Sequence, residues 1–336
     1  MTKLADIGEF GLIKRFSAQF ENMVSEGITG IGDDCAVIPA KDNDDVWLVT
    51  TDMLIEDRHF IRGKIAPYEL GYKSLAVNLS DVAAMGGSAH SAYLSIGIPE
   101  SIDVERLDEF FSGIKDLCVE TGTLFLGGDT TKSPEKLIIN IVVLGRAHLS
   151  QVKNRKAAKP GDMVCVTDNL GDSDAGLKAI LKKIELNEDV EFLIKKHHMP
   201  NPLLKEGLWL GDQPEINAMI DVSDGIESDM HRIMESSGTG AEINLDQIPI
   251  SPQCKKIADL HGWDIMDMAL TGGEDYCLMF TLPEYAFKQV KEDYQGHFHQ
   301  PFYPIGKITE NTGNLVFKYD DKPVDIKSHG FDHFRS

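Results

Sequence analysis

Long hydrophobic runs are missing from this sequence of 336 residues. Its most apolar stretch, residues 137–144, is too short to cross a bilayer and contains Asn140. Residues 1–10 carry Asp6 and Glu9 and contain no apolar segment of the kind found in signal peptides. We therefore expect a cytoplasmic protein that has no membrane partner.

Cysteine is scarce as well. The five cysteines are odd in number and show none of the paired spacings that mark zinc sites. They are Cys35, Cys118, Cys165, Cys254 and Cys277. We expect reduced thiols that fill small positions in the core, in agreement with a cytoplasmic location.

Basic residues are few relative to acidic ones. The sequence has 33 Lys and Arg against 54 Asp and Glu, which gives a formal net charge of −21 at pH 7. Such a negative field repels nucleic acid, so we expect no nucleic-acid partner. A small anionic substrate remains compatible with it if divalent cations mediate its contact with the carboxylates.

The common nucleotide-binding motifs are absent from the sequence. A phosphate-binding loop needs Gly-Lys followed by Ser or Thr, but both Gly63-Lys64 and Gly306-Lys307 are followed by Ile. The His-Arg-Asp loop of protein kinases and the His-Glu-x-x-His motif of zinc proteases do not occur either. If this chain transfers phosphoryl groups, it uses neither common scaffold.

The length of the chain favours two domains, because one hydrophobic core rarely organises so many residues. Short strand patterns alternate with helical ones, which predicts an α/β (α+β) fold. Apolar residues at helical spacing predict helices over residues 68–85 and 104–120. We place the boundary after residue 149, which gives an N-terminal domain of residues 1–149 and a C-terminal domain of residues 150–336. Strands are expected at residues 46–50, 123–126, 137–144, 163–167, 218–222, 241–245, 276–281 and 303–308.

Five predicted strands run directly into small, acidic turns. These turns are Gly30-Ile31-Gly32-Asp33-Asp34, Thr50-Thr51-Asp52, Gly127-Gly128-Asp129-Thr130-Thr131, Asp221-Val222-Ser223-Asp224-Gly225 and Gly272-Gly273-Glu274-Asp275. A single turn of this type is usually structural, and Asp224 could simply cap a helix that begins near Ile226. Five at one sheet edge would place carboxylates close together, where they repel unless cations neutralise them. Hard oxygen ligands suit Mg²⁺, so the pattern leaves a magnesium site and a structural role equally open.

Asp81 differs from the turn residues because it lies inside a predicted helix. Its neighbours are apolar or small, and a buried, unpaired carboxylate is costly, so it needs a partner or a metal. The alternative is a solvated helix face, which the nearby Lys73 and Ser80 allow.

These motifs, in this order, resemble those of the thiamine-monophosphate kinase family. The resemblance extends to His59-Phe60, to the helix at residues 77–86 and to the terminal Gly330-Phe331-Asp332-His333-Phe334, and so spans nearly the whole chain. The Gly-Asp-Asp and Gly-Gly-Asp turns also occur in aminoimidazole-ribonucleotide-synthetase-like relatives. The resemblance implies the fold of that superfamily: an N-terminal domain with a mixed sheet that forms a homodimer, and a C-terminal α/β domain that covers the cleft.

The resemblance also implies a reaction: ATP and thiamine monophosphate give thiamine diphosphate and ADP by direct in-line transfer, assisted by several Mg²⁺ ions. The implied Mg²⁺ ligands are Asp34, Thr50, Thr51, Asp52, Asp81, Asp129, Asp221 and Asp224. The implied ATP contacts are Thr121, Gly128, Asp129, Arg146 and Ser223. The implied thiamine-phosphate contacts are His59, Glu274 and Phe331. Thr121 stands where many members of the family carry Tyr, so it cannot provide a ring that stacks on adenine, and no residue is implied as a covalent nucleophile.

Three other functions fit part of the pattern. A synthetase of the same superfamily would activate an oxygen with ATP, but Phe331 and Glu274 argue against it. A multi-metal phosphatase would release free phosphate instead of ADP. A metal or nucleotide sensor would have no need of the full set of carboxylates.

Overall fold

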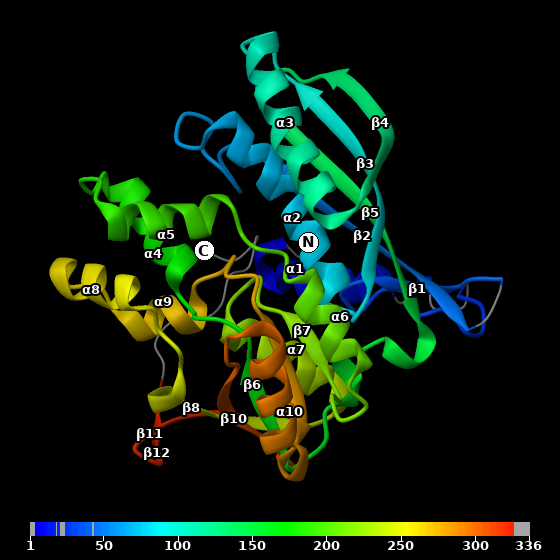
Figure 1. Ribbon diagram of the computed structural model, residues 1–336, viewed down its shortest axis with the longest axis vertical. Coiled ribbons are helices and arrows are strands. Elements are labelled where there is room, and N and C mark those ends of the chain that lie inside the picture. Colours follow the sequence, from blue (N-terminus) through cyan, green and yellow to red (C-terminus); the bar gives the residue numbers. More distant parts are fainter. Residues whose placement is uncertain (1–3, 18, 21–23, 42–43, 326–336) are drawn as a thin grey trace.

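The computed structural model describes residues 4–17, 19–20, 24–41 and 44–325. These residues form two β-sheets with helices packed on them, one sheet at each end of the long axis (Figure 1). The arrangement confirms the predicted mixed α/β fold. Within the described ranges, no helix combines the length and the apolar character needed to cross a membrane.

The N-terminal sheet has five strands in the order β1-β2-β5-β3-β4. Its neighbouring strands are antiparallel except for β3 and β4, which are parallel. The strands are β1 (Ala36–Pro39), β2 (Asp45–Ile55), β3 (Ser88–Ile98), β4 (Leu124–Lys132) and β5 (Ile138–His148). Alternate residues of β5, such as Ile139, Ile141 and Val143, are fully buried, because every second side chain points to the face that the helices cover.

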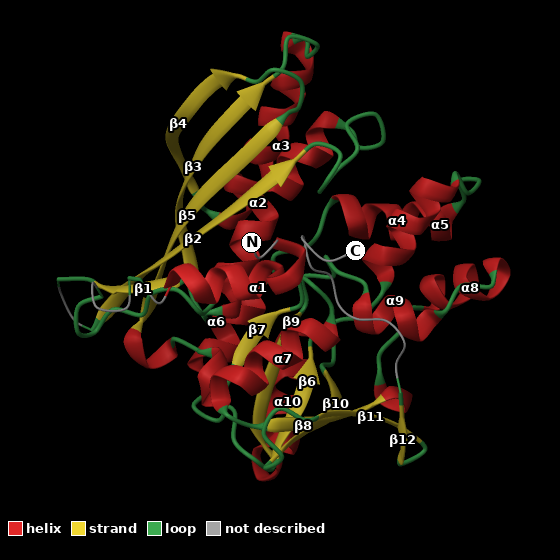
Figure 2. Ribbon diagram, turned by 180° about the vertical axis from the view of Figure 1, so that it is seen from behind, coloured by secondary structure: helices red, strands yellow, loops and turns green. Residues whose placement is uncertain are grey.

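Helices α2 (Pro67–Ala84) and α3 (Val104–Thr121) lie on one face of this sheet (Figures 1 and 2). Both confirm the helices expected from apolar spacing. Proline occupies the first turn of α2, where its missing N–H is harmless, and Gly122 ends α3 in the left-handed conformation. The two helices approach so closely that a Cβ on Gly71 would lie 1.9 Å from the carbonyl oxygen of Phe110.

The C-terminal sheet has seven strands in the order β12-β11-β8-β10-β6-β9-β7. They are β6 (Asp162–Val166), β7 (Met219–Asp221), β8 (Gly240–Asn244), β9 (Leu278–Pro283), β10 (Tyr303–Thr309), β11 (Leu315–Tyr319) and β12 (Lys322–Val324). The remaining helices are α1 (Leu4–Ser17), α4 (Asp172–Lys182), α5 (Glu188–His198), α6 (Leu204–Asp212), α7 (Ile226–Ser237), α8 (Pro252–His261), α9 (Ile265–Thr271) and α10 (Glu284–Phe298). The 3₁₀ turns are η2 (Leu149–Gln151), η3 (Arg155–Ala157) and η4 (Leu245–Gln247).

The last turn of α2 belongs to both halves of the molecule. Ala83 and Ala84 are fully buried in the core of the C-terminal sheet, although most of α2 packs on the N-terminal one. Helix α6 contacts α2 at Gly207, where a Cβ would lie 2.3 Å from the Ala83 carbonyl oxygen. Ser80 donates a hydrogen bond of 2.7 Å to Asp221 at the end of β7. Asp81 is thereby held between the two sheets.

Two of the five expected turns are wrong, and two others do not follow a strand among the described residues: the turn at residues 30–34 precedes β1, and the turn at residues 272–275 follows α9. Thr50-Thr51-Asp52 lies inside β2, whose pairing with β5 continues unbroken to Ile55. Gly127-Gly128-Asp129 lies inside β4, where positive φ angles at both glycines let the strand continue past a register shift against β3. The sequence also failed to indicate β1, β3, β11 and β12. The connection between β5 and β6 includes η2 and η3, and a domain boundary after residue 149 stays a prediction.

Candidate functional site

A large cavity of about 1190 Å³ opens between the two sheets, lined by both sheets and by α2, α4, α5 and α7. Most residues that the resemblance implicated line it. They are Asp34, Thr50, Thr51, Asp52, His59, Asp81, Asp221, Ser223, Asp224 and Glu274. The cavity therefore joins the residues expected to bind metal to two of those expected to bind the acceptor.

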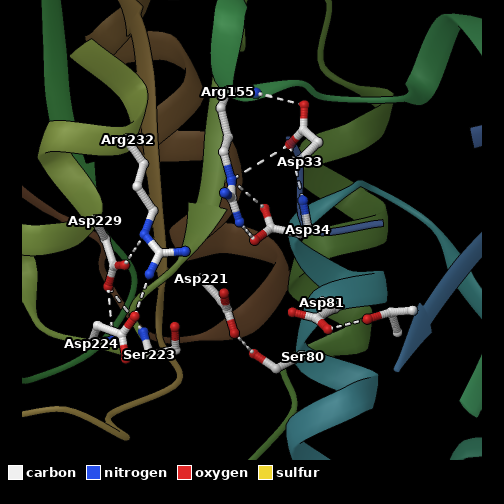
Figure 3. Close-up of polar contacts among 11 residues, drawn as sticks. Asp33, Asp34, Ser80, Asp81, Arg155, Asp221, Ser223, Asp224, Asp229 and Arg232 are labelled. Atoms are coloured by element: carbon white, nitrogen blue, oxygen red, sulfur yellow. Dashed lines mark hydrogen bonds and ion pairs between the residues drawn. The ribbon is translucent and has the colours of Figure 1, made fainter. Parts of the chain in front are cut away.

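Three carboxylates meet at one wall of the cavity. Asp34 precedes β1, Asp81 lies in α2 and Asp221 ends β7, and each offers an oxygen within 4.8 Å of the other two (Figure 3). Thr50 donates a hydrogen bond to Asp81, and Ser80 donates one to Asp221. The solvated alternative for Asp81 is therefore wrong, because its carboxylate faces other acids across the domain junction.

The protonation behaviour of this cluster reflects its crowding. Burial, reinforced by Asp224 and Asp34, raises the pKa of Asp52 to about 6. Burial and the charge of Asp34 raise the pKa of Asp221 to about 7, and burial with Asp52 and Asp221 raises the pKa of Asp81 well above its usual range. These groups therefore favour a compensating proton or cation. An all-oxygen donor set of this charge fits Mg²⁺.

The loop after β7 is fixed by a buried acid. Asp229 of α7 is fully buried, and its Oδ2 accepts hydrogen bonds from the backbone amides of Ser223 and Asp224, at 3.0 and 3.1 Å. Asp224 does not cap α7, whose N-cap is Gly225; its carboxylate pairs with Arg232 instead (Figure 3). The loop thus presents Asp224 to the cavity rather than to the helix end.

Glu274 and His59 also line the cavity, and Glu274 borders the loop that carries Asp224. Lys73 Nζ, only 1% exposed, lies 3.0 Å from Glu274 Oε2, and His197 Nδ1 lies 3.2 Å from the same oxygen. Burial alone would raise the pKa of Glu274, but Lys73 and His197 outweigh it and lower that pKa. His59 Nδ1 accepts a hydrogen bond of 2.9 Å from the Ile55 amide. A neutral His59 therefore carries its proton on Nε2.

The backbone around Glu274 is unusual. Glu274 has φ 65° and Tyr276 has φ 49°, both in the left-handed region that residues with a side chain rarely adopt. Their amides donate to the carbonyl oxygens of Ser223 and Val222, at 2.8 and 2.9 Å. The segment is thus pinned to the loop that carries Asp224, and strain of this kind persists where surrounding contacts enforce it.

Four implicated residues lie away from the cavity wall. Gly128 and Asp129 are exposed on β4, the edge strand of the N-terminal sheet. The Thr121 hydroxyl donates to the Leu117 carbonyl at the end of α3, and the Arg146 guanidinium lies 4.2 Å from the centre of the Trp47 ring. Within a single chain, these four residues therefore lie away from the acidic cluster. Phe331 lies outside the described residues.

Several residues that line the cavity were missed from the sequence. Lys73 was seen only as a possible solvated neighbour of Asp81, and Arg155 was not singled out. His197 and Arg232 gave no local signal. Each acquires its place through partners far away in the chain, such as Lys73 with Glu274 and Arg155 with Asp34.

Comparison with known proteins agrees with this geometry. Residues 32–147 match the family of the AIR synthase related protein, N-terminal domain, and residues 159–318 match the corresponding C-terminal domain. The chain is 37% identical to the thiamine-monophosphate kinase of Escherichia coli (strain K12), over 97% of this chain and 98% of that one. The chain belongs to the thiamine-monophosphate kinase family.

Another member of this kinase family, from Aquifex aeolicus, is 33% identical over 99% of this chain and all of that one. A solved structure described as AaThiL complexed with AMPPCP and TMP superposes with a TM-score of 0.86 and 31% identity, covering 99% of each chain. Hydrogenase maturation protein HypE shares the fold, with a TM-score of 0.68 and 16% identity over 92% of this chain and 96% of that one. The kinase family thus accounts for the whole length of the chain.

Proposed function

We propose that this chain transfers the γ-phosphoryl group of ATP to thiamine monophosphate, giving ADP and thiamine diphosphate. The observation that carries the proposal is the cavity whose lining includes both the acidic cluster around Asp34, Asp81 and Asp221 and the side chains of Glu274 and His59. The similar structure that holds AMPPCP and TMP together supports it, because its chain matches this one over 99% of both lengths.

Within this proposal, Mg²⁺ would bind the cluster and neutralise and align the two phosphate groups. Its ligands are those that the resemblance implied: Asp34, Thr50, Thr51, Asp52, Asp81, Asp129, Asp221 and Asp224. The raised pKa values of Asp52 and Asp221 support this assignment, since they report carboxylates that favour a cation.

The acceptor lies beside Glu274 and His59. Glu274 keeps its charge because Lys73 and His197 lower its pKa, so it can accept a hydrogen bond from the pyrimidine amine and attract the cationic ring. His59 can donate its Nε2–H to the acceptor phosphate, because Nδ1 is engaged by the Ile55 amide. The resemblance implies Phe331 as the aromatic contact of the thiamine ring. ATP lies beside the acidic cluster, with Ser223 from the same chain.

Direct in-line transfer follows from the state of these groups. The attacking atom is a phosphate oxygen of thiamine monophosphate, already ionised at neutral pH, so it needs little help from a base. His59 is the rival carrier of phosphate, but its Nδ1 accepts a hydrogen bond and its Nε2 holds the proton, which leaves neither nitrogen free to attack.

The remaining nucleotide contacts require a second copy of the chain. Asp129, Gly128, Thr121 and Arg146 lie outside the cavity, and the adjoining β4 exposes three apolar side chains, Leu124, Phe125 and Leu126, between 40% and 54%. An apolar edge strand is usually covered by a partner. We therefore infer a homodimer through the N-terminal sheet, formed by residues 1–149, with the domain of residues 150–336 closing the site. Light scattering at micromolar concentration should give twice the chain mass of 37.2 kDa; the monomer mass would exclude this arrangement.

A rapid-quench experiment tests direct transfer. The full chain is mixed with Mg²⁺ and γ-labelled ATP, thiamine monophosphate is omitted, and the protein is isolated after milliseconds to seconds. We expect no label on the protein, together with normal turnover once acceptor is added. Stoichiometric label that passes to thiamine diphosphate on addition of the acceptor would show a phosphoenzyme and refute direct transfer.

A further inference from the structure

Two guanidinium groups line the cavity beside the acidic cluster, and neither has a role in the function proposed above. Arg155 lies in η3, in the connection between the two sheets, and Arg232 lies in α7. Their side chains are only 12% and 21% exposed. Each guanidinium group is therefore largely shielded from solvent and positioned by its contacts within the protein.

Arg155 pairs with the two acids that precede β1 (Figure 3). Its Nη2 donates to Asp34 Oδ1, its Nε lies 3.4 Å from Asp34 Oδ2, and the same Nε lies 3.6 Å from Asp33 Oδ1. Its backbone amide also donates to Asp33 Oδ2, at 3.3 Å. Both oxygens of Asp34 thus face Arg155, although Asp34 is one of the three carboxylates that converge within 4.8 Å.

Arg232 makes a similar arrangement beside the Asp224 loop (Figure 3). Its Nη2 donates to Asp224 Oδ2, and its Nε lies 3.5 Å from Asp229 Oδ1. Asp229 is fully buried and already holds the backbone of the Asp224 loop, so of the two acids that Arg232 contacts only Asp224 is an assigned metal ligand. Asp34 and Asp224, two of the assigned metal ligands, are thus each paired with an arginine of the same chain.

A guanidinium and a divalent cation compete for the same carboxylate oxygens, because both carry positive charge and need the same lone pairs. The planar guanidinium is also the side chain best suited to phosphate, which it binds through two parallel hydrogen bonds. A guanidinium displaced from Asp34 or Asp224 remains in a cavity where, on the proposed function, phosphate groups bind.

We propose that Arg155 and Arg232 are exchangeable counter-ions. They neutralise Asp34 and Asp224 in the metal-free protein, and they transfer to phosphate oxygens of the nucleotide when divalent cations take those carboxylates. The inference rests on the proposed function and deepens it. The exchange makes metal binding weak in the absence of nucleotide. It also couples metal binding to nucleotide binding, so that the carboxylate cluster binds cations when the nucleotide binds.

The test measures binding of Mn²⁺ to the full chain by calorimetry, with and without AMPPCP and without any turnover. Arg155→Met and Arg232→Met each remove one counter-ion. Lys64→Met is the matched control, because Lys64 lines the same cavity and its loss removes the same charge. Without nucleotide, we expect each arginine variant to bind Mn²⁺ at least about five-fold more tightly than the wild type, while Lys64→Met changes little. The tightening of Mn²⁺ binding by AMPPCP should shrink in both arginine variants.

Arg155→Lys keeps the measurement decisive if Arg155→Met does not fold. Lysine retains the charge but not the planar fork, so Mn²⁺ binding without nucleotide should stay close to that of the wild type, while the effect of AMPPCP weakens. Unchanged or weaker Mn²⁺ binding in the arginine variants would overturn the exchange, and so would an equal gain in Lys64→Met. If the wild type itself bound no Mn²⁺ even with AMPPCP, the metal assignment of the proposed function would fall, and the exchange with it.

Discussion

Replacing Lys73 with methionine should destabilise the protein far more than the loss of an ordinary lysine. The ammonium group is 1% exposed and lies 3.0 Å from Glu274 Oε2. Methionine fills a similar volume but leaves the Glu274 carboxylate without its main positive partner. Breaking a buried pair from one side costs about 3–5 kcal/mol. We expect about 3 kcal/mol, the lower end, because Glu274 is 26% exposed and can regain some water.

A double-mutant cycle measured by urea unfolding checks this value. Lys73→Met, Glu274→Gln and the double variant are compared with the wild type, and the midpoint is followed by tryptophan fluorescence. Because the double variant has no unpaired charge, it should recover most of the loss, with a coupling of about 2–3 kcal/mol.

Lys307→Met is the matched control for this cycle. Lys307 forms an ion pair with Glu284 at the same distance of 3.0 Å, but the two side chains are 50% and 67% exposed. Exposed pairs of this kind contribute about 0–1 kcal/mol. The reasoning fails if Lys73→Met is no more destabilising than Lys307→Met, or if the losses of the single variants simply add.

Three further predictions concern stability and activity. Burial and Lys73 lower the pKa of His197 to about 3, against the opposing charge of Glu274; His198 and Ser173 also face it. His197 therefore contributes stability that is present above its unfolded pKa of about 6.5 and lost as the pH falls toward 3, by up to about 1.4 kcal/mol per pH unit. His197→Gln should show a shallower loss in acid denaturation, and an identical slope would contradict this. Gly207→Ala should destabilise the contact between α6 and α2, because its Cβ would meet the Ala83 carbonyl at 2.3 Å. Gly296→Ala on the exposed face of α10 is the control and should stabilise the protein by up to about 1 kcal/mol. Thermal unfolding compares the two variants, and equal shifts of the melting temperature would count against the close approach. Asp81→Asn should lower turnover by roughly 100-fold or more at saturating Mg²⁺. It should cause no loss of thermal stability, because it relieves the repulsion of Asp81 by Asp52 and Asp221. Near-normal turnover would show that Asp81 is not a metal ligand.

Local signals in the sequence were enough for two helices of the N-terminal half, α2 and α3, but not for α1. Pro67, Gly122 and the apolar spacing between them mark α2 and α3 within one or two residues. Asp81 was singled out for the same reason, because a carboxylate on an apolar helix face needs a partner whatever the fold; its role as a metal ligand stays a prediction. These inferences depend only on residues within a few turns of one another.

The parts that were missed depend on contacts between distant segments. Arg155 meets Asp34 across 121 residues and Lys73 meets Glu274 across 201, so neither pairing leaves a local pattern. The motifs at Thr50 and Gly128 were expected in turns, because small and acidic residues usually end strands. In the fold they continue β2 and β4, where pairing with β5 and β3 overrides local preference.

Analysis of the reaction products tests the proposed phosphoryl transfer. The purified chain is incubated with Mg²⁺, γ-labelled ATP and thiamine monophosphate, and the products are separated by chromatography. We expect the label to appear in thiamine diphosphate, with ADP formed in equal amount. Label recovered as free phosphate, with thiamine monophosphate unchanged, would contradict it and would favour a multi-metal phosphatase.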